Sequence, residues 1–304
     1  KSPQSFGKAI TNREESPVAT LKGTSADRRS VLIVDQVDAV SEISGRNGAT
    51  KQAVLRLVDD ARNFGNIVVV ICCRTFALEN DERLKSLKES HGVENVDVQL
   101  LDWEATVKPL LTSKSIATDF FSESQIALLR LPLNLALFVE TYDPRSPFFT
   151  SRSELFRRFL EKKRISIEAD SSITWGLIQP ISRLAEWMSE QQRLDAPEAI
   201  LSPFPRALSM LPSEGLIVRS KGNINFFHES FFDYIYALTF SERDLSLEAL
   251  LLQTEQHLFR RTQVRQILEN LRQSDRTRYL RELCSVFGNT KVRYHIQVAV
   301  AKWL

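Results

Sequence analysis

The chain has 304 residues, of which 43% are hydrophobic and 26% charged, and this length favours two or three domains with substantial cores. Its 40 Lys and Arg nearly balance its 38 Asp and Glu, which gives no support for a general nucleic-acid-binding or membrane-binding surface. Three cysteines, two of them adjacent, do not suit a disulfide framework and indicate a reducing, cytoplasmic setting. Ten glycines and eleven prolines are few, which favours a helix-rich fold.

The first third of the chain has the pattern of an α/β domain. Residues 1–29 are polar and predicted to be irregular, apart from a short helix at 16–23. Strands are predicted at 31–35, 67–73 and 96–100, with helices at 51–64 and 81–90. The first two strands are continuous apolar runs, which is typical of strands buried on both faces. Strands that alternate with helices predict a parallel sheet.

The remaining two thirds are predicted to be almost entirely helical. Apolar residues at three- and four-residue spacing predict helices at 104–111, 122–129, 133–140, 152–165, 173–191 and 196–210. Residues 215–219 and 224–227 flank a Ser-Lys-Gly-Asn turn, which predicts a β-hairpin of the kind called a wing. An aromatic-rich helix follows at 229–242. Paired helices of similar length are then predicted at 247–258, 263–273, 276–287 and 292–303, as at the start of a helical repeat array.

Two charged residues follow the predicted buried strands. Asp35 ends the first strand, and Arg74 directly follows the second. At the carboxyl edge of a parallel sheet, an acid can reach a magnesium ion beside nucleotide phosphates, and an arginine fork can pair with phosphate oxygens. The alternatives are an acid that caps the following loop and an arginine in a surface ion pair. Their occurrence together, one helix apart, favours a phosphate-binding crevice.

Four segments, in this order, give the chain a family resemblance. Residues 31–41 and 44–46 resemble the Walker B strand and loop of STAND-class P-loop NTPases, most of all the bacterial antiviral (Avs-type) members and their NACHT relatives. The strand that ends at Arg74 resembles their sensor 1. Residues 131–133 (Leu-Pro-Leu) resemble the short proline motif of their helical domain, and residues 227–234 resemble the histidine motif of their winged-helix domain.

The resemblance implies a role for each matching residue. Asp35 would hold Mg²⁺, Arg74 would sense the γ-phosphate of ATP, and Pro132 would line the base pocket. His228 would bind the β-phosphate of ADP and so hold the winged helix against the nucleotide domain. A histidine can donate a hydrogen bond to phosphate at neutral pH, and nearby anions favour its charged form. The alternative for His228 is a core histidine at the start of an aromatic helix.

The chain departs from the family at two places. Gln36 follows Asp35, where many P-loop ATPases have the carboxylate that polarises water, so either Asp38 substitutes for it or hydrolysis is slow. The phosphate-binding motif G-x-x-x-x-G-K-[ST] does not occur in the 304 residues. We expect this loop and its strands to precede residue 1, and the chain alone to be inactive as an ATPase.

In the family the P-loop strand lies between the sensor 1 strand and the last strand. Residues 31–35 are therefore expected to pair in parallel with 67–73, and 96–100 with neither.

The expected organisation is a partial P-loop NTPase core at 1–102, a helical domain at 103–168, a winged-helix domain at 169–243, and the start of a helical sensor array at 244–304. The resemblance implies an ATP/ADP switch in which a protein ligand, in the Avs-type relatives a viral protein, binds the C-terminal helices. Oligomerisation would then activate an effector in antiviral defence. No membrane partner is expected.

Two other functions fit parts of the pattern. One is a DNA-binding regulator that uses the winged helix, although the helix after the wing is aromatic and apolar, whereas base readout needs exposed Arg, Lys, Asn or Gln. Nucleic acid is therefore not the expected partner. The other is a non-catalytic scaffold whose NTPase core is degenerate.

Overall fold

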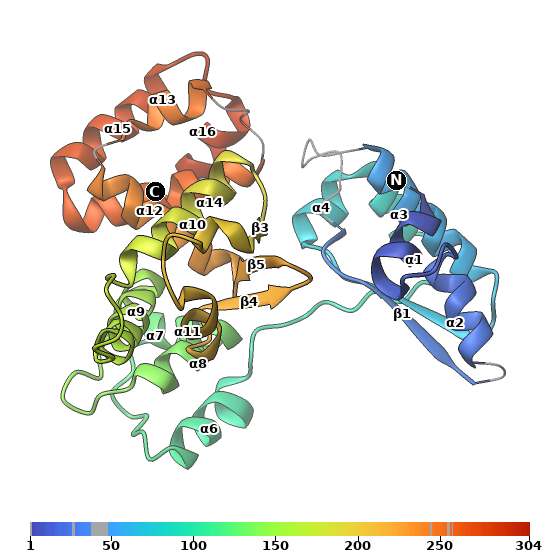
Figure 1. Ribbon diagram of the computed structural model, residues 1–304, viewed down its shortest axis with the longest axis horizontal. Helices are drawn as coiled ribbons and strands as arrows, with labels where there is room; N and C mark the ends of the chain where they lie inside the picture. Colours follow the sequence, from blue (N-terminus) through green and yellow to red (C-terminus); the bar gives the residue numbers. More distant parts are fainter. Residues whose placement is uncertain (1, 26–27, 38–47, 244, 254–255, 257) are drawn as a thin grey trace. The chain divides into compact units, whose positions relative to one another are not determined.

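The computed structural model describes residues 2–25, 28–37, 48–243, 245–253, 256 and 258–304 (Figure 1). The chain forms two compact units, Lys1–Asp97 and Val98–Leu304, which are described separately below as unit 1 and unit 2. The described residues are mostly helical, with a two-stranded parallel sheet in unit 1 and a small antiparallel sheet in unit 2.

Unit 1 is built around the parallel sheet. Its elements are α1 (Pro3–Thr11), α2 (Pro17–Ser25), β1 (Ser30–Val34), α3 (Gly48–Arg62), β2 (Ile67–Ile71), α4 (Thr75–Asn80) and α5 (Glu82–Lys88). Strand β1 pairs in parallel with β2, in a register that aligns Val31 with Val68 and Val34 with Ile71. The predicted parallel pairing of these two segments is therefore confirmed.

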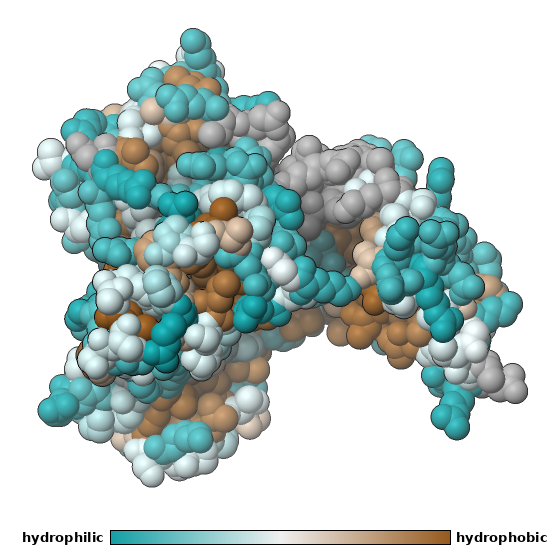
Figure 2. All heavy atoms as spheres, in the orientation of Figure 1, coloured by the Kyte–Doolittle hydropathy of each residue, from teal (hydrophilic) through white to brown (hydrophobic). Residues whose placement is uncertain are grey.

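The residues that the structure describes cover only one face of this sheet. Leu32 and Ile67 are buried against Val18 of α2 and against Leu57 and Ala61 of α3. On the opposite face the alternate residues remain 41–65% exposed; they are Val31, Ile33, Val68 and Val70. Figure 2 shows hydrophobic side chains at the surface of this unit. The expectation of strands buried on both faces is thus wrong for the described chain, because α2 and α3 pack on the same side.

Two further predictions for unit 1 need correction. Residues 96–100 form no strand; Val96 and Val98 are 78% and 93% exposed, and the segment pairs with neither β1 nor β2. The predicted lack of pairing is confirmed, but the predicted strand is wrong, since alternation alone does not supply a hydrogen-bonding neighbour. Residues 3–11, predicted to be irregular, form α1, whose N-cap Ser2 makes a reciprocal capping box with Ser5.

Unit 2 begins with five helical segments that agree with the sequence periodicity. They are the π-helical turn η3 (Trp103–Val107), α6 (Lys108–Ser113), α7 (Glu123–Leu129), α8 (Pro132–Thr141) and α9 (Arg152–Glu168). Ser122 caps α7 through a capping box with Gln125, and Ser151 caps α9 by accepting from the backbone N–H of Glu154. These local signals explain why both helices start where the sequence predicts.

The middle of unit 2 combines helices with the antiparallel sheet. Its elements are α10 (Ile178–Glu190), β3 (Ala196–Pro197), η4 (Glu198–Leu201), α11 (Ala207–Ser213), β4 (Ile217–Ser220), β5 (Asn223–Phe226) and α12 (Glu229–Glu242). The strands lie in the order β3-β5-β4. The predicted hairpin is confirmed: β4 and β5 join through Lys221 and Gly222, both with positive φ. The single helix predicted at 196–210 is wrong, because a short strand and a 3₁₀ turn precede α11.

The last elements of unit 2 are α13 (Leu247–Gln253), α14 (Leu258–Ser274), α15 (Arg276–Gly288) and α16 (Tyr294–Ala301), four helices as predicted. Helix α14 packs against α12, α15 and α16. One hydrophobic core extends from Val107 to Val300 through all parts of this unit. Aromatic side chains of α9 and α12 form its centre, with Phe156 5.4 Å from Phe231 and Phe159 5.7 Å from Phe231 between ring centroids.

Candidate functional site

Asp35 and Arg74 leave the parallel sheet at the same edge. Asp35 follows β1 directly, and Arg74 lies three residues beyond the end of β2. Backbone hydrogen bonds continue past the strand ends, from Cys72 N to Val34 O at 2.9 Å and from Val37 N to Cys72 O at 3.1 Å. Both charged side chains are exposed. The structure therefore brings the two predicted residues to one edge, as the sequence order of parallel strands requires.

The turn after Asp35 has an unusual backbone. Gln36 has a φ of 54°, in the left-handed region that non-glycine residues rarely adopt. Its N–H donates to Asp35 Oδ1 at 2.9 Å, which orients the carboxylate at the strand end. Such a conformation costs about 1–2 kcal/mol for an L-residue, and positions of this kind concentrate at functional sites.

A magnesium site at this edge would need few protein ligands. Among the described residues no group of three or more His, Cys, Asp or Glu side chains could hold a metal ion. Mg²⁺ beside nucleotides is usually held by one or two carboxylates, with phosphate oxygens and water as its other ligands. The exposed carboxylate of Asp35 fits that pattern. Asp38, the candidate to polarise water, lies outside the described residues.

Pro132 occupies the first position of α8. The ring is exposed, and at this position the missing N–H removes no helical hydrogen bond. Two side-chain hydrogen bonds hold this end of the helix: Asn134 Nδ2 donates to Leu128 O at 2.9 Å, and Arg152 Nε donates to Asn134 Oδ1 at 3.1 Å. Pro132 is thus presented at the surface of unit 2 from a firmly held turn.

His228 is the N-cap residue of α12 and directly follows the hairpin. Its Nδ1 accepts a hydrogen bond from the backbone N–H of Ser230 at 3.0 Å, and its ring is exposed. The alternative interpretation of His228 as a core histidine is therefore wrong, because its ring is not buried. Because Nδ1 is an acceptor, the capping tautomer carries its proton on Nε2, where a neutral imidazole can donate to an anion. This hydrogen bond fixes the orientation of the ring at the start of α12.

The cap leads to a testable prediction. We expect His228→Ala to lower the free energy of unfolding of unit 2 by about 1 kcal/mol, because the N–H of Ser230 loses its acceptor. Asparagine is a preferred N-cap residue, so His228→Asn should retain most of that stability. Urea unfolding, followed by a spectroscopic signal from unit 2, measures the free energy of unfolding of both variants. Equal losses in the two variants would contradict a capping role.

The four described candidates fall into two pairs. Asp35 and Arg74 belong to unit 1, whereas Pro132 and His228 belong to unit 2. Within each unit the candidates lie at the ends of regular elements, on exposed backbone turns. The aromatic residues around His228 belong mostly to the core: Phe226, Phe231, Phe232, Tyr234 and Tyr236 are buried, and Phe227 is half-buried.

Sequence reasoning missed a buried ion pair in unit 1. Lys51 Nζ, near the start of α3, donates to both carboxylate oxygens of Asp81, at 2.7 and 2.8 Å. Their side chains are 2% and 0% exposed. Asp81 also caps α5 by accepting from the backbone N–H groups of Arg83 and Leu84. Asp81 before a helix is a recognisable capping signal, but nothing in the local sequence indicates its partner thirty residues away.

Comparison with models of known protein families gave no match, and neither did comparison with curated proteins. In the described part of the chain, none of the helices has both the length and the apolar character needed to cross a membrane.

Proposed function

We propose that the chain is the switch region of a STAND-class P-loop NTPase, which binds ATP or ADP with Mg²⁺ and hydrolyses ATP slowly. The observation that carries this proposal is the parallel pairing of β1 with β2, which puts Asp35 and Arg74 at one carboxyl edge. In parallel α/β sheets, ligands bind outside the carboxyl ends of the strands. A carboxylate and a guanidinium there suit a metal ion and a terminal phosphate, respectively.

Each residue has a defined part in this proposal. Asp35 would anchor Mg²⁺, which when bound neutralises phosphate charge and orients the phosphates. Arg74 would pair with the terminal phosphate and so distinguish ATP from ADP. A complete nucleotide site would also need a phosphate-binding loop, whose motif the 304 residues do not contain.

The element order around the hairpin supports a winged-helix module. Residues 178–226 run helix, strand, short helix, helix, strand and strand, and the three strands lie in the order β3-β5-β4. This order is that of a winged helix, with β4 and β5 as the wing. His228 follows the wing with its ring exposed, at the position where the resembled proteins contact the phosphate of ADP. On this proposal that contact holds the switch closed with ADP, and Pro132 contacts the base.

The same geometry counts against the DNA-binding alternative. Helix α11, which precedes the wing, has the sequence Ala-Leu-Ser-Met-Leu-Pro-Ser and offers no Arg, Lys, Asn or Gln for base readout. Arg219 on the wing makes two hydrogen bonds to Glu198, at 3.0 and 2.8 Å. Arg206 pairs with Asp170. These two cations are thus engaged with carboxylates of the chain, which favours the switch over a nucleic-acid reader.

The partners follow from the same proposal. A protein ligand would bind the C-terminal helices and open the closed, ADP-bound state. ATP would then replace ADP, and the ATP-bound protein would self-associate. Because a ligand shifts an equilibrium only by its differential affinity, it must favour the open state. Antiviral defence by a bacterial host is the setting in which proteins of the resembled type use such a switch.

ATP hydrolysis by the full-length protein tests the proposal. Asp35→Asn removes the charge but preserves the shape of the side chain, and we expect at least a hundredfold loss of Mg²⁺-dependent turnover, because the metal loses its protein anchor. Asp59→Asn, on the exposed side of α3 in the same unit, is the matched control and should retain wild-type turnover. Normal turnover in Asp35→Asn would contradict the metal role. Failure of the wild-type protein to bind ATP would favour a non-catalytic scaffold.

A further inference from the structure

Charge is distributed unevenly along the chain. Residues 258–304, which contain α14, α15 and α16, have ten Arg and Lys but three acids, a net charge of +7. The preceding 257 residues have 30 Arg and Lys against 35 Asp and Glu, a net charge of −5. The near-neutral total of +2 therefore combines an acidic larger part with a strongly basic C-terminal region. Such a region attracts anionic partners over distances beyond direct contact.

The three acids of this region are hydrogen-bonded within the chain. Glu269 Oε1 accepts from Ser153 Oγ at 2.8 Å, and Asp275 Oδ1 accepts from the backbone N–H of Arg278 at 2.9 Å. Glu282 is 4% exposed, and its Oε2 accepts from the first backbone N–H of α13 at 2.9 Å. Of the three, only Asp275 is exposed.

Most cations of this region are exposed and unpaired. Among the residues that the structure describes, six exposed cations have no carboxylate partner: Arg265, Arg272, Arg276, Lys291, Arg293 and Lys302. Arg281, by contrast, lies 3.9 Å from Glu282. The exposed carboxylates in the described parts of α13 to α16 are Asp275 and Glu248, and Glu248 accepts from Asn289 Nδ2 at 2.6 Å. The surface of these helices therefore remains positively charged.

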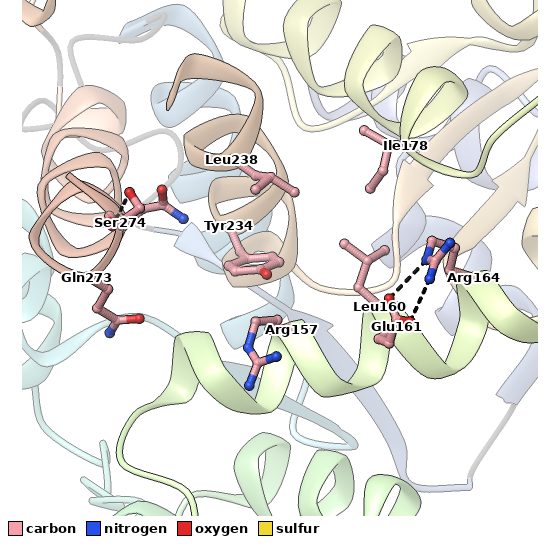
Figure 3. Close-up of a pocket in the computed structure, with 10 residues that line it drawn as sticks. Arg157, Leu160, Glu161, Arg164, Ile178, Tyr234, Leu238, Gln273 and Ser274 are labelled. Carbon is pink, nitrogen blue, oxygen red and sulfur yellow. Dashed lines mark hydrogen bonds and ion pairs between the residues drawn. The ribbon is translucent and has the colours of Figure 1, made fainter. Parts of the chain in front are cut away.

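Arginines elsewhere in unit 2 have acidic partners. A groove of about 450 Å³ among α9, α12 and α14 provides the comparison (Figure 3). At its rim Arg157 lies 3.8 Å from Glu154, and Arg164 contacts Glu161 at 2.6 Å and Glu168 at 3.0 Å. The charges at that groove are balanced, whereas those of the C-terminal helices are not.

The exposed side of α15 combines unpaired cations with apolar side chains. Four exposed residues lie four, four and three positions apart, so they share one side of the helix; they are Arg276, Leu280, Cys284 and Phe287, and we call them the α15 face. Leu280 and Phe287 are 48% and 42% exposed. Lys291 and Arg293 follow at the C-terminal end of the helix. Figure 2 shows hydrophobic side chains among hydrophilic ones in the region of α13 and α15, which pack together.

We propose that the α15 face docks an acidic amphipathic helix of a partner protein. The carboxylates of that helix pair with Arg276 at one end of the face and with Lys291 and Arg293 at the other, and its apolar residues cover Leu280 and Phe287. The face is about 16 Å long, or about three helical turns, and a partner helix has apolar residues at the same three- and four-residue spacing. Complementary charge steers the encounter and fixes the register.

The apolar centre of the face favours a protein over other anionic partners. A nucleic-acid backbone would place charged phosphates against Leu280 and Phe287. An anionic membrane would require these two side chains to enter the boundary of the acyl chains, but more than half of each is packed within the chain. An acidic amphipathic helix supplies carboxylates and apolar contacts together.

The α15 face would receive the protein ligand of the proposed switch, and this role rests on the proposed function. Docking itself uses neither Asp35 nor Arg74. Absence of docking would overturn the role of the α15 face alone, whereas normal ATP turnover in Asp35→Asn would overturn the metal role alone.

Fluorescence anisotropy on the full chain, without nucleotide, tests the docking with three labelled helical peptides. The first has Leu on one side and Glu on the other, the second has Lys in place of Glu, and the third has Ser in place of Leu. The first should bind saturably and about tenfold more tightly than the second, whose charge is repelled. It should bind about fivefold more tightly than the third, which lacks the apolar contact. Salt raised from about 50 to about 300 mM should weaken its binding.

Two sets of variants assign the binding to the α15 face. Arg276→Gln with Arg293→Gln should weaken binding of the acidic peptide about tenfold. Lys114→Gln with Arg145→Gln removes the same charge from exposed positions elsewhere in unit 2 and should weaken it less than about twofold.

Leu280→Gln should weaken binding of the acidic peptide about fivefold, whereas Leu110→Gln, at a 41% exposed leucine of α6, should leave it unchanged. Equal binding of the acidic and lysine peptides, an unchanged affinity in the Arg276 and Arg293 double variant, or no saturable binding would each overturn the proposal. Tighter binding of a short DNA duplex, or of vesicles containing phosphatidylserine, with the same dependence on Arg276 and Arg293 would also overturn it.

Discussion

Replacing Lys51 with methionine should lower the free energy of unfolding of unit 1 by about 3–5 kcal/mol, because it leaves the buried carboxylate of Asp81 without its cation. Both side chains are almost completely buried, and the ammonium contacts both carboxylate oxygens within 2.8 Å. The pair joins the start of α3 to the N-terminus of α5. Its loss should therefore loosen the helices that flank β2, as well as the site of substitution.

Native-state hydrogen exchange of the amides in α3 and β2 measures this effect in unit 1 without interference from unit 2. The double variant Lys51→Met with Asp81→Asn should recover much of the loss, because asparagine can still cap α5 and no buried charge remains. Lys8→Met is the exposed control in the same unit: the side chains of Lys8 and its partner Glu14 are 66% and 87% exposed, so a loss of less than about 1 kcal/mol is expected. A loss that small for Lys51→Met would show that the pair adds little to the stability of unit 1.

The second large effect is expected at Arg278 of α15, whose guanidinium caps the C-terminal end of α12. Nη1 donates to Ser241 O at 2.7 Å, and Nη2 donates to Leu245 O at 2.7 Å and to Phe240 O at 3.3 Å. Arg278 is 6% exposed and lies over the Phe240 ring at 5.5 Å. Arg278→Leu removes donors from two carbonyls in the last turn of α12 and from one just beyond it, so we expect the free energy of unfolding of unit 2 to fall by about 3 kcal/mol or more.

Arg276→Leu provides a control in the same helix, because Arg276 is exposed and lies only two residues before Arg278. It should alter the free energy of unfolding by less than about 0.5 kcal/mol. The free energy of unfolding of Arg278→Lys should lie between those of Arg278→Leu and Arg276→Leu, since a lysine can reach one carbonyl but lacks the planar fork. Thermal unfolding monitored in unit 2 distinguishes the three variants. Equal stability of Arg278→Leu and Arg276→Leu would contradict the capping role of Arg278.

These buried contacts bear on how a C-terminal ligand could act on the proposed switch. Helix α12 begins at the His228 cap and ends at the carbonyls held by Arg278. Arg260 of α14 similarly reaches the end of α10, donating to Ser189 O at 3.0 Å and to Ser189 Oγ at 2.6 Å. The helices after residue 243 are thereby hydrogen-bonded to the two long helices on either side of the hairpin.

Local sequence signals predicted most helices of unit 2. Helix α12 has the predicted bounds because apolar spacing continues along it, and α9 begins at its predicted residue because Ser151 caps it. The errors occur where stability depends on a distant partner. Residues 96–100 have the alternation of a strand but pair with neither β1 nor β2. The apolar spacing at 196–210 predicted one helix, whereas Ala196–Pro197 pairs with β5.

The sequence by itself determined most of the helices, the hairpin of β4 with β5, and the parallel direction of β1 and β2, which gives Asp35 and Arg74 a shared edge. These follow from apolar runs, turn residues and the geometry of parallel strands, all of which are local or nearly so. Only the tertiary structure decided that His228 is an exposed cap and that Lys51 pairs with Asp81. Each of these depends on which residues meet in space and on whether water is excluded there, and spacing along a single chain does not encode either property.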